Sequence, residues 1–83
     1  MYHRGIIERM AAEVFYEVYA LLSGFPFKSL VYNECPDLVN NCLLSEVIDI
    51  GQHYGTETAH QVLEIINQQI SKPINPQRLL WKV

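Results

Sequence analysis

The sequence predicts an all-α fold: a small helical bundle of three longer helices plus a short C-terminal helix. Apolar residues recur three and four positions apart along three stretches, which is the period of an amphipathic helix. Glycine and proline stand between these stretches, where they end one helix and open the next. The breaks are short, which favours antiparallel neighbours. The 83 residues are expected to form one helical domain, residues 1–83.

The first helix is expected over residues 4–23. Its core face carries apolar side chains at helical spacing, namely Ile7, Met10, Ala11, Val14, Phe15, Val18, Leu21 and Leu22. The opposite face carries Arg9, Glu13, Tyr16 and Ala20. Gly24 and then Pro26 supply the stop, because glycine accepts a left-handed cap and proline cannot continue the helix.

Residues 25–34 are predicted to connect the first two helices, and two conformations stay open for them. Pro26 suits the first position of a short helix. Leu30, Val31 and Tyr32 equally suit a short extended piece. An irregular or short helical connector is the favoured interpretation.

The second helix is expected over residues 36–54, in the middle of the core. One apolar stripe runs through Val39, Leu43, Val47, Ile50 and Tyr54. It is widened by Leu38, Cys42, Leu44 and Ile48. The polar residues form only a narrow strip of Asn41, Ser45, Asp49 and Gln52. A helix that is apolar almost all round is usually central.

The third helix is expected over residues 57–71. Gly55 is the expected C-terminal cap of the helix before it, and Thr56 the expected N-cap. The residues predicted to face inward are Ala59, Val62, Leu63, Ile66 and Ile70. Those predicted to face water are His60, Glu64, Asn67, Gln68 and Ser71.

Pro73 is expected to end the third helix, and Asn75 with Pro76 to open a short last one. The final residues include Leu79, Leu80, Trp81 and Val83. They are too apolar for a frayed tail. We expect them to dock, either on the chain's own core or on a neighbouring molecule.

The composition indicates a protein that contacts other proteins. Hydrophobic residues make up 49% of the chain and charged residues 18%, so apolar surface is left for a partner or a second copy. The net charge is −3, and the six Lys and Arg residues are scattered, which disfavours nucleic-acid binding. An acidic chain suits a basic surface on another protein.

The sequence also carries an expectation about location. No charged leader with an apolar run and cleavage site opens the chain, and no apolar run approaches the ~20 residues that span a membrane. Cys35 and Cys42 do not make a disulfide framework. The chain is therefore expected to be cytoplasmic, without membrane contact.

No catalytic, cofactor-binding or metal site is expected, and the chain is predicted not to be an enzyme. The residues that invite a zinc site are Cys35, Cys42, His53 and His60. The two cysteines are seven positions apart, as are the two histidines. That is about 10 Å along a helix, whereas structural zinc sites use closer pairs. Nothing in the sequence activates either cysteine as a nucleophile.

The leading hypothesis is a non-enzymatic protein–protein interaction module. Such a chain would be a small acidic adaptor, regulator or inhibitor of a larger protein machine, and we expect it to self-associate as a homodimer. Tyrosine and tryptophan are favoured where one end of a side chain is dry and the other wet. The predicted interface residues are Glu13, Tyr16, Glu17, Tyr19 and Trp81.

The alternative is a small regulator of the helix-turn-helix type that binds nucleic acid. Its contact residues would be Gln61, Asn67, Gln68, Arg78 and Lys82. Asparagine and glutamine can read base edges. Glu57 and Glu64 on the same helix would repel phosphates, so this function is disfavoured.

Overall fold

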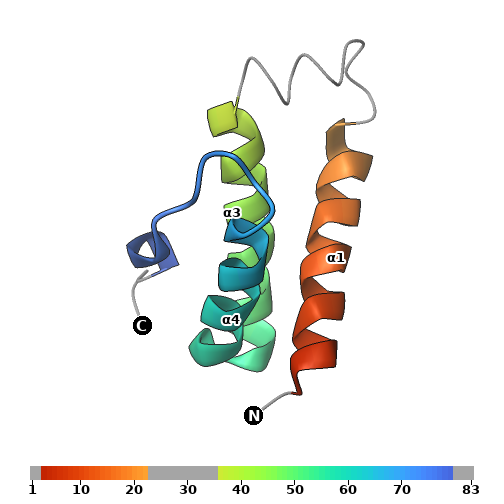
Figure 1. Cartoon of the computed structure of the whole chain (residues 1–83), viewed down its shortest axis with the longest axis vertical. Coiled ribbons are helices and arrows are strands. Elements are labelled where there is room, and N and C mark those ends of the chain that lie inside the picture. The colour runs from red at the N-terminus through yellow and green to blue at the C-terminus, as the bar shows by residue number, and fades with distance from the viewer. Residues whose placement is uncertain (1–2, 23–35, 80–83) are drawn as a thin grey trace.

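The computed structural model describes residues 3–22 and 36–79, and within these ranges the chain is helical without a strand (Figure 1). The elements are α1 (Arg4–Leu22), α3 (Pro36–Tyr54), α4 (Thr56–Asn67) and the short 3-10 helix η1 (Pro76–Leu79). The all-α prediction is confirmed for this part of the chain. The connector predicted at 25–34 lies outside the described residues, as do Trp81 and Lys82.

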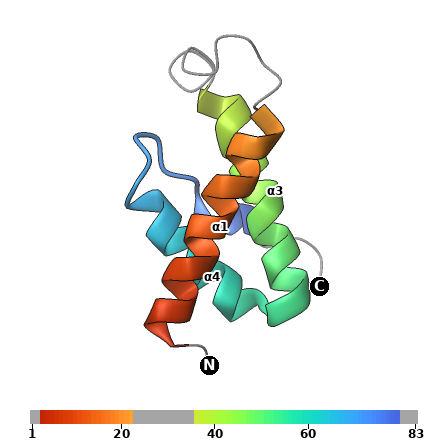
Figure 2. The ribbon, with the colours of Figure 1, turned by 90° about the vertical axis from the view of Figure 1, so that its right-hand side faces the viewer.

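The three α-helices each contact the other two. The chain runs along α1, returns along α3 and turns back again into α4, so α3 is antiparallel to its neighbours (Figure 1). Seen from the side, α1 packs across the α3–α4 pair (Figure 2). The helix η1 contacts α3 and α4 on the side away from α1 (Figure 1). The expected central position of α3 is therefore shared with α4.

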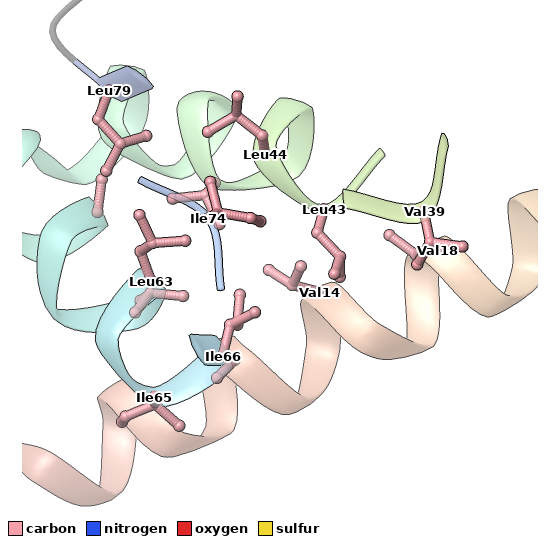
Figure 3. Close-up of a cluster of buried hydrophobic side chains, with 14 of the residues drawn as sticks. Val14, Val18, Val39, Leu43, Leu44, Leu63, Ile65, Ile66, Ile74 and Leu79 are labelled. Atoms are coloured by element: carbon pink, nitrogen blue, oxygen red, sulfur yellow. The ribbon is translucent and has the colours of Figure 1, made fainter. Parts of the chain in front are cut away.

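The core is a continuous cluster of aliphatic side chains from all four elements (Figure 3). The largest completely buried side chains are Val18, Leu22, Leu43, Val47, Val62, Leu63, Ile66 and Leu79. They recur three and four positions apart on each helix, so each helix turns one stripe inward. Removing surface of this kind from water is the main contribution to the stability of a small fold.

The start of α1 is capped by His3. Its carbonyl accepts hydrogen bonds from the backbone N–H groups of Ile6 and Ile7 at 3.0 and 3.1 Å, and its Nδ1 accepts one from Gly5 N–H at 3.1 Å. These bonds satisfy N–H groups that a helix start otherwise leaves without partners. The helix has the predicted beginning and runs at least to Leu22. One core prediction is wrong, because Leu21 is 60% exposed.

The bounds predicted for α3 are confirmed, and all four residues of its predicted polar strip are exposed. Two residues predicted for its apolar face are not buried. Leu38 is 41% exposed and Tyr54 is 50% exposed, so neither belongs to the core. Asn40 is buried instead, and its Nδ2 donates to the carbonyl oxygen of Lys72 at 2.8 Å.

The break between α3 and α4 depends on Gly55, which has φ 98° and ψ 155°. Residues with a Cβ avoid this region of backbone conformation. Gly55 N–H donates to the Gly51 carbonyl at 2.9 Å, and its own carbonyl accepts from Ala59 N–H at 3.2 Å. The predicted N-cap is wrong: Gly55 occupies that position, and Thr56 is the first residue of α4.

The helix α4 ends at Asn67 and not at the predicted residue 71. The backbone N–H groups of Gln68 and Gln69 donate to the carbonyls three positions earlier, which tightens the last turn. Beyond it the chain folds back, and Ile74 and Leu79 are buried in the chain's own core at 2% and 1% exposure. The described part of the C-terminal segment therefore docks within the molecule.

Candidate functional site

An open groove of about 600 Å³ lies between α1 and α3, and no residue of α4 lines it. We call it the α1/α3 groove. Its apolar lining residues are Ile6, Met10, Val14, Tyr16, Ile50 and Tyr54. Its charged lining residues are Arg9, Glu13, Glu17 and Glu46.

The residues that line the two sides of this groove lie at helical spacing on α1 and α3. On α1 the lining residues lie three and four positions apart from Ile6 to Glu17, which puts them on one side of the helix beside the core stripe. On α3 the lining residues Glu46, Ile50 and Tyr54 are each four positions apart. Two stripes on antiparallel helices thus face a common space.

The groove is polarised along its length. The carboxylates of Glu17 on α1 and Glu46 on α3 are close enough for the charge of Glu17 to raise the pKa of Glu46. Because α1 and α3 are antiparallel, Ile50 and Tyr54 lie toward the end of the groove where α1 begins, beside Ile6. One end of the groove is therefore acidic, and the other carries apolar residues together with Arg9.

No carboxylate at the acidic end is in an ion pair within the described part of the chain. The ion pairs found there, Arg4–Glu8 and Lys72–Asp37, include no carboxylate of the groove. Partial burial raises the pKa of Glu46 above its ordinary value, and the nearby charges of Glu17 and Asp49 raise it further. Both causes disfavour the ionised form of Glu46, which a cation from outside the chain would favour.

Exposed apolar side chains border the groove on both sides. Tyr16 is 75% exposed on α1, and Ile6 on the same helix is 43% exposed. Tyr54 faces the groove from α3, with its ring centroid 6.3 Å from that of His53. Large side chains left in water in this way are characteristic of contact surfaces.

The structure brings together three of the five residues predicted for an interface, namely Glu13, Tyr16 and Glu17. Tyr19 is also exposed but lines a second groove, of about 350 Å³, beside Asn40 and Lys72. Trp81 lies outside the described residues. Glu46 and Tyr54 were not predicted as interface residues, although each lies four positions from Ile50 on the same helix.

Two of the five residues predicted for nucleic-acid contact, Asn67 and Arg78, make hydrogen bonds within the chain. The Asn67 side chain binds the backbone of Ile74 at both ends: its Nδ2 donates to the carbonyl and its Oδ1 accepts from the N–H, each at 2.9 Å. Arg78 Nη2 donates to Asn41 Oδ1 at 3.0 Å. Gln61 is half-buried and Gln68 is exposed, while Lys82 lies outside the described residues. The prediction that Asn67 faces water is wrong.

Among the described residues, no three His, Cys, Asp or Glu side chains come together as a metal site requires. Cys42 is half-buried and is not in a disulfide, and Cys35 lies outside the described residues. None of the described helices is long and apolar enough to cross a membrane.

Comparison of the chain with models of protein families, with curated proteins and with solved structures finds no match.

Proposed function

We propose that this chain is a non-enzymatic protein-binding module. In this proposal a small helical bundle with a short C-terminal helix serves as an acidic adaptor, regulator or inhibitor of a larger protein. The observation that carries it is the α1/α3 groove, where exposed tyrosines border carboxylates that are in no ion pair within the described part of the chain.

The physical chemistry of the groove supports contact with a protein. Covering Tyr16 and Tyr54 removes apolar surface from water, while their hydroxyl groups can stay at the wet rim. Carboxylates beside them favour partners with a basic surface and repel acidic ones, which gives selectivity as well as faster association.

The proposal is tested by photo-crosslinking in the cells that make the protein. A photo-reactive amino acid at Tyr16 is expected to capture a defined partner protein, whereas the same amino acid at the exposed Glu57 of α4 is not. With that partner purified, Tyr16→Ala is expected to weaken binding roughly tenfold or more, as loss of a central aromatic contact does.

Tyr19→Ala is the matched control, because it removes the same side chain from the same helix outside the groove. It is expected to change the affinity by less than about twofold, below the cost of a central contact. Capture at Tyr16 and Glu57 alike, or a Tyr16→Ala variant that binds as tightly as the wild type, would show the proposal to be wrong.

The nucleic-acid function remains a weaker alternative. Asn67 and Arg78 already hold parts of the chain's own structure, and Glu57 and Glu64 are exposed on α4. A titration with DNA and RNA at low salt, where binding to phosphates is strongest, separates the two functions.

A further inference from the structure

We propose that the occupant of the α1/α3 groove is an amphipathic helix of a partner protein, apolar toward one end and rich in arginine or lysine toward the other. This inference rests on the proposed function and specifies the partner's chemistry. It follows from the length of the groove, from its lining and from the order of its charges.

The length of the groove matches a short helix. Its lining on α1 runs from Ile6 to Glu17, which corresponds to about 16 Å of helix axis or three turns. The walls are two antiparallel helices with apolar residues between them, the arrangement in which amphipathic helices bind as an added helix. A helix placed there contacts α1 and α3, as α4 already does elsewhere on these helices.

The partner's charge follows from the acidic end. Glu13 and Glu17 stand on one side of the groove and Glu46 on the other, so a cation between them meets carboxylates from both helices. Arginine suits this end best, because its planar group can pair with a carboxylate and also stack on the ring of Tyr16. Arg9, the one cation in the lining, makes no ion pair within the described ranges.

The partner's apolar residues belong at the other end. Ile6, Met10, Ile50 and Tyr54 offer it an apolar surface. Arg9 lies at this end as well and repels a partner's cations from it. A second copy of the chain is a poor occupant, since its net charge is −3 and its own groove carries three glutamates against one arginine. A nucleic acid is a poor occupant for the same reason, because its phosphates are negative.

The test measures binding of a synthetic helical peptide to the full chain by fluorescence anisotropy. The probe has leucines at helical spacing and arginines clustered in one half. A second probe has the cluster in the opposite half, and a third has glutamate in place of arginine. We expect one arginine probe to bind, more weakly as salt is raised, and the glutamate probe not to bind.

Two double variants separate the effect of charges in the groove on probe affinity from the effect of the chain's net charge. Glu13→Gln with Glu17→Gln removes two charges from the groove and is expected to weaken binding about tenfold, a change of about 1.4 kcal/mol. Glu57→Gln with Glu64→Gln removes two charges from the exposed face of α4 and is expected to change the affinity less than about twofold, since it leaves the groove intact. Circular dichroism checks that both variants keep their helices.

Equal losses in the two double variants would overturn the inference, because net charge alone would explain binding. Equal binding of the glutamate probe, or no binding of either arginine probe, would overturn it too. The inference can also fail while the proposed function stands. If Tyr16 crosslinks to an acidic protein or to a second copy, the chain still binds protein there, but not the helix proposed.

Discussion

Glu46 is the groove residue whose own charge is least favourable in the folded chain. Its carboxylate is half-buried and lies near two other acidic groups, Glu17 on α1 and Asp49 one turn further along α3. Glu13 and Arg9 line the same groove. The pKa of Glu46 in the folded chain lies above its ordinary value, so the folded chain binds the carboxyl proton more tightly than the unfolded chain does.

The pH dependence of stability follows from that direction. At pH values below the ordinary carboxyl pKa, Glu46 is neutral in both the folded and the unfolded chain. As the pH rises from there through the raised pKa of the folded chain, the free energy of unfolding falls. We expect Glu46→Gln to raise the midpoint of thermal unfolding at pH 7 and to leave it unchanged near pH 4. Thermal scans across this range measure the difference, with the exposed Glu64→Gln as the control variant.

An unchanged midpoint for Glu46→Gln at pH 7 would contradict this view of the groove. The carboxylate would then be well solvated, and the acidic end would not favour an external cation. A gain shared by Glu64→Gln would instead reflect the chain's net charge of −3. The opposite case within the molecule is Asp37, where the hydrogen bond from Lys72 lowers the pKa of the carboxyl on an exposed pair.

At the scale of elements, the bounds of a helix were predictable where the apolar spacing agreed with the positions of proline and glycine. Pro36 and Gly55 bracket α3, and the apolar period between them is continuous, so both bounds follow from the sequence. The end of α4 did not follow. Its apolar period runs on to Ile70, but the Asn67 side chain offers the backbone of Ile74 an alternative to further helix.

The segment after α4 is therefore predicted to depend on Asn67. Asn67→Ala leaves the N–H and carbonyl of Ile74 without their partners and is expected to cost about 1–3 kcal/mol in the free energy of unfolding. Chemical denaturation measures this cost, and hydrogen exchange at Ile74 should rise with it. Gln68→Ala, next along the chain and exposed, is expected to change stability by less than about 0.5 kcal/mol.

If Asn67→Ala loses no more stability than Gln68→Ala, the two hydrogen bonds to Ile74 do not hold the segment in place. Asn67 would then again be a candidate for an external contact. Asn67→Asp refines the test. It keeps an acceptor for Ile74 N–H but removes the donor to the carbonyl, so its stability is expected to fall below that of the wild type.

At the scale of the whole molecule, spacing within one helix cannot give the register between two helices. Tyr16 was recognisable because it stands opposite the core face of its own helix. Tyr54 shares a stripe with Val47 and Ile50, and only the packing of α3 against α1 leaves its ring at the rim. Glu46 likewise becomes part of a site only when Glu17 is brought beside it. The candidate site was thus half predictable, from α1 alone.

Self-association remains a prediction from composition, and the groove constrains how it can occur. A contact between two α1/α3 grooves would bring two sets of Glu13, Glu17 and Glu46 into one interface, which costs free energy. We therefore expect a homodimer whose contact lies outside the groove. Light scattering on a sizing column across a dilution series measures the mass, and Glu13→Gln with Glu17→Gln should leave it unchanged.

The two ways in which this expectation can fail have different consequences. A dimer strengthened by Glu13→Gln with Glu17→Gln would place the groove between two copies, and the inferred basic helix would lose its site. A monomer at every concentration would make the homodimer prediction wrong. The exposed surface of Ile6 and Tyr16 would then stay in water in the free chain. Surface of that kind persists in a small protein where a different molecule covers it.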